Sequence, residues 1–119
     1  NGIMYFGQRF LDPANKEIAV RFLSVYLKAL RELMSEDYQN DENLAIINKY
    51  TKLDPEVVRN TLLTYQDPNC TLLPDSLEKT QAYYIARGYT DYQELIPIED
   101  VIDESFRKAA VSQLGEYKK

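Results

Sequence analysis

The feature that most constrains the fold is a long amphipathic segment between Asp12 and Ser35. Asp12 followed by Pro13 is typical of a helix start, because Asp caps free N–H groups and proline fits the first helical position. On a helical wheel, one half of the segment that follows is apolar and the other half is charged or hydroxylated. The apolar half comprises Ile18, Phe22, Leu23, Tyr26, Leu27, Leu30, Leu33 and Met34. We therefore predict a helix over residues 13–35 whose apolar half is buried.

Four further helices are predicted, over residues 41–51, 54–65, 74–87 and 103–114. Asp41, Asp54 and Asp103 are the expected caps of three of them, and Gly88 is placed to end the fourth. One more helical turn is expected near residues 98–102. Within 54–65, the apolar residues spaced to meet a neighbouring element are Val58, Leu62 and Tyr65.

The stretch "IMYFGQRF", Ile3 to Phe10, is rich in strand formers and predicts a strand over about residues 3–10. No other segment gives a convincing strand signal, so its backbone donors and acceptors would need a partner from elsewhere. The expected fold is therefore mainly α, with about five helices and one N-terminal strand that lacks a ladder partner.

Size and charge narrow the functional classes. The chain has 119 residues, which suits one domain or a piece of a larger one. Its net charge of -5 argues against binding to nucleic acid, and its few basic residues do not cluster. No apolar run is long enough for a transmembrane helix, and a single cysteine excludes an internal disulfide.

The sequence offers few groups for catalysis. It contains no histidine, which removes histidine-based acid–base chemistry and the commonest transition-metal ligand. Cys70 has no neighbouring base, so we interpret it as a half-buried loop residue rather than a nucleophile. We assign no catalytic, cofactor-binding or metal-binding residue, and the ligand-binding residues stay unknown.

Two side-chain clusters allow a functional interpretation beside a structural one. Four carboxylates lie within six positions: Glu99, Asp100, Asp103 and Glu104. A divalent cation is conceivable there, but helix capping is the preferred interpretation. Four tyrosines could stack a planar ligand, although we favour the rim of a core: Tyr83, Tyr84, Tyr89 and Tyr92.

A set of short motifs then suggests a family. In chain order they are Asp67-Pro68-Asn69, Ser76-Leu77, Gln81, Tyr84, Gly88-Tyr89, Val101, Asp103, Ser105-Phe106, Ala110, Leu114-Gly115 and Tyr117. This pattern resembles the C-terminal end of the substrate-binding proteins of ABC transporters for nitrate, sulfonate, taurine and thiamine-pyrimidine precursors. The fungal thiamine-pyrimidine synthases share that family. Residues 2–33 resemble the return strand and following helix of the same family.

The resemblance implies that residues 1–119 are one C-terminal segment of a two-lobed α/β periplasmic-binding-protein fold (type II). It implies capture of a small organic or anionic solute by cleft closure, without catalysis, and delivery to an ABC permease. It further implies an extracytoplasmic protein, periplasmic or lipid-anchored at the cell surface, whose signal peptide lies outside this chain.

Two alternatives stay open. The chain could be a free-standing helical module that binds protein and forms a homodimer as an isolated fragment. It could also belong to an enzyme of the thiamine-pyrimidine-synthase type, whose histidines would lie upstream.

Overall fold

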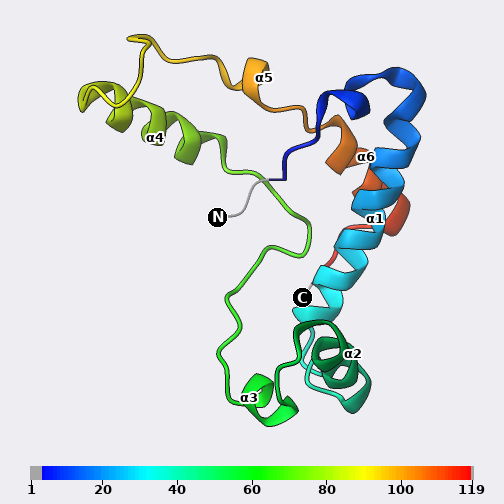
Figure 1. Cartoon of the computed structure of the whole chain (residues 1–119). Helices are drawn as coiled ribbons and strands as arrows, with labels where there is room; N and C mark the ends of the chain where they lie inside the picture. The colour runs from blue at the N-terminus through cyan, green and yellow to red at the C-terminus, as the bar shows by residue number, and fades with distance from the viewer. Residues whose placement is uncertain (1–3, 119) are drawn as a thin grey trace.

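The computed structural model describes residues 4–118, and its longest element is helix α1, Lys16–Leu33 (Figure 1). Two short 3-10 helices precede it, η1 (Gln8–Leu11) and η2 (Pro13–Asn15). The Asp12 carboxylate accepts a hydrogen bond from the Ala14 N–H at 2.9 Å, as expected for a cap. The predicted helix over 13–35 therefore opens with a 3-10 turn and is α-helical from Lys16.

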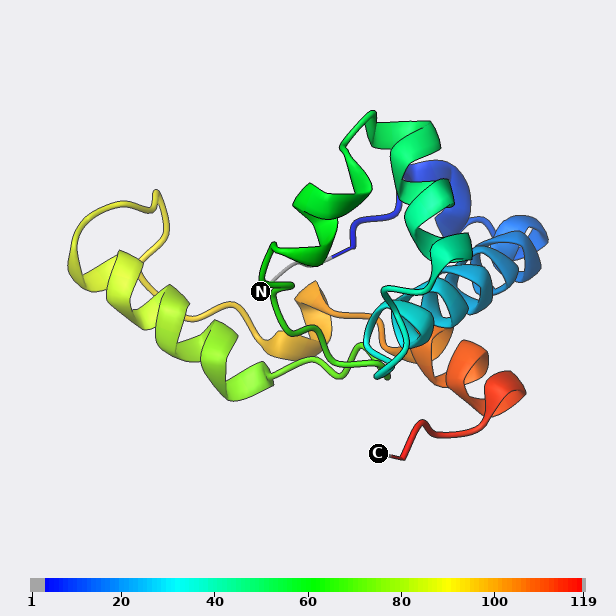
Figure 2. The same cartoon turned by 90° about the horizontal axis from the view of Figure 1, so that it is seen from below.

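The core forms where α1 packs along α6, Ser105–Leu114, the last helix of the chain. These two helices lie side by side in both views (Figures 1 and 2). The buried residues at their contact are Ala19, Val20, Leu23, Leu27, Phe106 and Ala110. Small alanines on both helices allow close approach, and the larger side chains fill the space around them.

The half of α1 predicted to be buried is only partly covered. Leu23, Leu27 and Leu30 are buried as expected, but Ile18 and Phe22 keep 52% and 54% of their surface exposed. Ser24, assigned to the wet half, is buried, and its hydroxyl donates to the Val20 carbonyl at 2.9 Å. The predicted apolar half is thus displaced from the buried one, because α6 covers only one side of it.

The predicted strand at residues 3–10 is wrong for the residues that the structure describes. Ile3 lies outside them, residues 4–7 form no regular element, and η1 begins at Gln8. No strand occurs anywhere within residues 4–118, so a ladder partner is missing there. Phe6 and Phe10 pack instead on the core, where the Phe6 ring lies 5.5 Å from that of Phe106.

Helix α2, Asp41–Thr51, has the predicted bounds, but its cap is Asn40 rather than Asp41. The Asn40 side chain accepts from the Asn43 N–H at 2.9 Å. Leu44 is the one residue of α2 that is buried.

Helix α3, Pro55–Arg59, is much shorter than the predicted 54–65. The Asp54 carboxylate caps it as expected, accepting from the Glu56 N–H at 2.8 Å. At the end of α3 the Asn60 side chain donates to the Glu56 carbonyl and the Thr61 hydroxyl to the Val57 carbonyl. The chain then runs extended, and the three apolar residues expected to meet a neighbour are not buried: Val58, Leu62 and Tyr65.

Helix α4, Pro74–Ala86, and the single turn α5, Ile98–Val101, form an arm that stands away from α1 and α6 (Figures 1 and 2). Gly88, with φ +67°, ends α4 as predicted. The Tyr89 N–H donates to the Tyr84 carbonyl and the Gly88 N–H to the Ile85 carbonyl, the Schellman pattern of helix ends. The arm, residues 74–101, has no buried residue within its two helices.

The mainly α prediction is confirmed, yet the chain leaves an unusually large surface open. Its accessible area is 9301 Å², whereas a compact monomer of 13.9 kDa exposes about 6,700 Å². Its radius of gyration is 17.8 Å, against about 13.5 Å for a compact chain of this length. The helices therefore offer roughly 2,600 Å² beyond what a self-contained domain of this mass would show.

Candidate functional site

The most highly connected polar group joins the loop after α3 to the end of the chain. The side-chain oxygen of Asn69 accepts from the Tyr117 N–H at 2.9 Å and from Arg31 Nη2 at 3.0 Å. Its amide nitrogen donates to the Tyr117 carbonyl at 3.1 Å. Asn69 therefore binds both backbone groups of one distant residue and a helix cation at once. We call the contacts among Arg31, Pro68, Asn69, Gly115 and Tyr117 the Asn69 node.

Arg31 supplies the second half of this node from the last turn of α1. Its guanidinium donates to the Pro68 carbonyl at 3.2 Å and to the Gly115 carbonyl at 2.7 Å. It also lies 5.8 Å from the centre of the Tyr117 ring. On the helical wheel Arg31 falls in the charged half of α1, so these contacts with Pro68, Gly115 and Tyr117 were not predicted. The available signal was its position on the wheel, directly beside the buried Leu27 stripe.

Asp67 fixes the loop that presents Asn69. Its carboxylate accepts from the Asn69 N–H at 2.9 Å and from the Thr71 N–H at 2.8 Å. Burial alone would raise the pKa of Asp67, but hydrogen bonds from Thr71 and Asn69 outweigh it and hold that pKa below its ordinary value. Asp67 is thus a carboxylate at neutral pH, and its charge is part of the folded loop.

Cys70 lies in the same loop, half-buried as predicted, with a left-handed φ of +50°. Burial and the nearby Asp67 charge raise the pKa of its thiol. The thiol therefore stays protonated and weakly nucleophilic at neutral pH, which agrees with its interpretation as a structural residue.

The four clustered carboxylates serve separate purposes. The Asp103 carboxylate accepts from the Ser105 N–H at 2.8 Å, and Ser105 lowers its pKa. Glu104 pairs with Lys108 at 2.9 Å and with Arg107 at 2.8 Å. Lys108 is the main cause of its lowered pKa. Capping and ion pairing therefore account for Asp103 and Glu104, while Glu99 and Asp100 lie in the first turn of α5.

Within residues 4–118, no three carboxylate or thiol groups gather closely enough to hold a metal ion.

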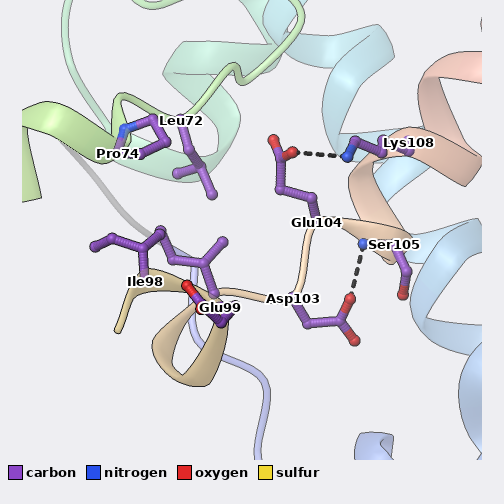
Figure 3. A pocket seen from close by; sticks show the side chains of 9 residues that line it. Leu72, Pro74, Ile98, Glu99, Asp103, Glu104, Ser105 and Lys108 are labelled. Carbon is purple, nitrogen blue, oxygen red and sulfur yellow. Dashed lines mark hydrogen bonds and ion pairs between the residues drawn. The ribbon is translucent and has the colours of Figure 1, made fainter. Parts of the chain in front are cut away.

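A shallow cavity of about 450 Å³ lies between the start of α4, α5 and the start of α6 (Figure 3). Its apolar wall comes from Leu72, Pro74, Ile98 and Ile102. Figure 3 shows Glu104 turned toward Lys108 and Asp103 toward the Ser105 backbone. Both carboxylates are therefore already bonded to protein groups rather than directed into the cavity. Polar residues also line the cavity, among them Ser105, whose buried hydroxyl has no hydrogen-bond partner within residues 4–118. Because Asp103 and Glu104 are already bonded to protein groups, we assign no ligand to this cavity.

The tyrosines of the arm are a surface feature rather than the rim of a core. Tyr83, Tyr84 and Tyr89 are exposed, and Tyr92 is half-buried. The Tyr84 and Tyr89 rings lie 6.0 Å apart, the apolar contact that accompanies a Schellman helix end. The first three therefore remain available for contact with another molecule, without forming a cage.

An exposed apolar surface lies on α1. It consists of Ile18, Phe22, Val25 and Tyr26, which lie on adjacent positions of the helical wheel, and we call it the open α1 face. Val25 keeps 66% of its surface exposed. The Phe22 ring lies 6.3 Å from that of Phe6.

The motif residues of the family resemblance fall into two groups. Asp67, Pro68, Asn69, Gly115 and Tyr117 converge at the Asn69 node, and Phe106 and Ala110 are buried in the core beside it. The others are not part of the node. Ser76, Leu77, Gln81, Tyr84, Gly88, Tyr89 and Val101 lie on or near the arm, and Asp103, Ser105 and Leu114 lie at the two ends of α6. Gln81 joins α4 to the segment before α5, because its side-chain amide donates to the Ile96 carbonyl and accepts from the Ile96 N–H, both at 3.1 Å.

Comparison with known proteins adds no relative: no family model, curated protein or solved structure matches this chain.

In residues 4–118, helices that are long and apolar enough to span a bilayer are absent.

Proposed function

We propose that this chain is the C-terminal part of an extracytoplasmic solute-binding protein that serves an ABC permease. The full-length protein would capture a small organic or anionic solute by closure of a cleft between two α/β lobes, with no covalent step. Residues 1–119 would contribute helices to one lobe of that type II fold.

The observation that carries the proposal is the Asn69 node. The motifs "DPN" and "GEY" lie more than 40 residues apart, and the resemblance links them only by their order in the sequence. In the folded chain the Asn69 side chain binds the Tyr117 backbone, and Arg31 reaches both motifs. Motif residues that share one contact network are what a common fold would require, whereas chance matches would be scattered.

The excess surface is a second, independent support. A chain with about 2,600 Å² more exposed area than a compact monomer needs further surface to cover it. Packing against the remaining parts of a larger lobe would meet that need.

A ligand screen on the full-length protein tests the proposal. We expect taurine, an alkanesulfonate, nitrate or a thiamine-pyrimidine precursor to raise its melting temperature in a thermal-shift measurement. At 100 times its dissociation constant, a ligand stabilises the folded state by about 2.7 kcal/mol. Glucose at the same concentration serves as the control. If none of the test solutes moves the transition, the transport assignment is refuted.

A helical protein-interaction module is the second candidate, and the open α1 face favours it. Four large apolar side chains on one helix face form a contact surface of the kind found in helix-mediated binding. A strong thermal shift with a small solute would favour the transport assignment over this one.

A further inference from the structure

Two exposed apolar surfaces that no other element of residues 4–118 covers lie on different parts of the chain. The open α1 face presents Ile18, Phe22, Val25 and Tyr26 to solvent. The arm presents its own exposed apolar side chains, which lie on and after α4: Tyr83, Tyr84, Tyr89, Leu95, Ile96 and Val101. Both surfaces are larger than the isolated apolar residues normal for a monomer.

Their charges are opposite. Helix α1 has four cations and two carboxylates, a net charge of +2. Lys16 lies over the Phe106 ring and Arg31 belongs to the Asn69 node, so the cations beside the open α1 face are Arg21 and Lys28. The arm has six carboxylates and two cations, a net charge of -4; the carboxylates are Asp75, Glu78, Asp91, Glu94, Glu99 and Asp100. All six carboxylate residues are exposed. Arg21 and Lys28, which flank the open α1 face, form no ion pair among residues 4–118.

The available area is enough for a stable dimer. A standard interface buries about 800 Å² on each partner, and obligate homodimers bury more. The surplus of roughly 2,600 Å² belongs to the whole chain, of which the two surfaces are a part, and is about three times the area that one partner of a standard interface buries.

We propose that the 119-residue chain forms a two-fold symmetric dimer in which the arm of each copy packs on the open α1 face of the other. The apolar side chains of the two surfaces would form the centre of each contact. Arg21 and Lys28 would meet arm carboxylates at its rim, where opposite charges favour the correct pairing. The two contacts are equivalent, so the assembly closes at two copies.

Light scattering after size exclusion tests the stoichiometry. We expect a mass twice the 13.9 kDa of one chain. If the chain is still a monomer at about 0.1 mM, which is 100 times a micromolar dissociation constant, the proposal is overturned. This holds whether the monomer stays extended or folds its arm back on its own α1.

A matched pair of variants tests the surface. Val25→Glu places a charge on the most exposed residue of the open α1 face and does not disfavour a helix, since Glu is a better helix former than Val. We expect it to raise the dimer dissociation constant by roughly tenfold or more, because the carboxylate would have to be buried. Leu62→Glu is the control, because Leu62 is 97% exposed and lies outside both surfaces. Equal affinities for the two variants would contradict the assignment of the face.

Charge reversal tests the pairing of arm with face. A variant with Arg21→Glu and Lys28→Glu has acidic faces and acidic arms, and should dimerise poorly. A variant with Glu78→Lys, Asp91→Lys and Glu94→Lys has basic faces and arms whose net charge changes from -4 to +2, and should also dimerise poorly. An equimolar mixture pairs opposite charges at both contacts, so we expect it to regain the dimer mass. Failure of the mixture to associate refutes the reciprocal arrangement.

This inference does not depend on the proposed function. Ligand screening uses the full-length protein and reads out its melting temperature, whereas the dimer measurement uses the 119-residue chain and reads out its mass. Either result can fail without the other.

Discussion

At the scale of single residues, Asn69 is the side chain on which the tertiary structure most depends. One amide holds both backbone groups of Tyr117 and a guanidinium nitrogen of Arg31. An asparagine suits this position because it carries an acceptor and a donor on one planar group. Aspartate would keep the acceptor but lose the donor to the Tyr117 carbonyl.

We expect Asn69→Ala to lower the free energy of unfolding by about 1–3 kcal/mol, because three hydrogen bonds are lost and Arg31 is left with fewer partners. Asn60→Ala is the matched control, since Asn60 is exposed and bonds only to the Glu56 carbonyl of its own helix. That control should cost within about 0.5 kcal/mol. Urea denaturation of both variants gives the comparison, and equal losses would show that the node contributes no special stability.

The second prediction at this scale concerns Asp67 and acid. Its pKa is lower in the folded chain than its ordinary value, so the carboxylate form is favoured by folding. The stability it contributes is complete above the unfolded pKa of about 3.9 and is lost as pH falls through the lower folded pKa. Asp103 and Glu104 act in the same direction, because their pKa values are also lowered.

We therefore expect Asp67→Asn to reduce stability at pH 7 and to flatten, without abolishing, the loss of stability below about pH 4. Urea denaturation at a series of pH values between 7 and 3 measures this. An unchanged acid dependence would mean that Asp67 has the same pKa in both states.

At the scale of elements, the α1–α6 pair is the part of the chain that behaves as a core. Its helices pack through alanines and leucines, and its rim is closed by Phe6 and Phe10 from the N-terminal segment. The Lys16 ammonium lies 5.3 Å above the Phe106 ring and shields the end of this core from water.

Leu27 belongs to this core and keeps 1% of its surface exposed. We expect Leu27→Ala to destabilise the chain by about 2–5 kcal/mol, through lost burial and the cavity left behind. Leu62→Ala removes the same atoms from a residue that is 97% exposed and should be nearly neutral. Thermal unfolding followed by circular dichroism at 222 nm distinguishes them; a neutral Leu27→Ala would contradict the packing described for α1 and α6.

At the scale of the whole molecule, stability is expected to be uneven. The α1–α6 pair contains most of the buried residues, whereas α4 has none and contacts only α5. Local unfolding of α4 therefore breaks backbone hydrogen bonds with little loss of apolar burial.

Hydrogen exchange should show this contrast. We expect amides of residues 20–30 to exchange at least about 100-fold more slowly than those of residues 78–86, since a difference of 1.4 kcal/mol in opening free energy is a factor of ten. Mass spectrometry of peptic fragments, at concentrations low enough for a monomer, provides the measurement. Raising the concentration until the proposed dimer forms should then slow exchange in the arm. Uniform protection in the dilute chain would contradict the unequal packing.

The sequence alone determined where most helices begin and end. Asp12, Asp54 and Gly88 act through bonds to groups a few residues away, so these signals do not depend on the rest of the fold. The same local physics explains why α2 has its predicted bounds.

Only the tertiary structure decided which apolar residues are buried and which polar residues bridge distant segments. Periodicity marks a helix face as apolar but cannot say how much of it a neighbour will cover, which is why Ile18 and Phe22 remained open. Residues 4–10 had the composition of a strand, yet strand formation needs a partner ladder, and within the described chain Phe6 and Phe10 found a helical core instead. The Asn69 node depends on contacts across more than 40 positions, and such contacts form only once α1 and α6 have brought both ends of the chain together.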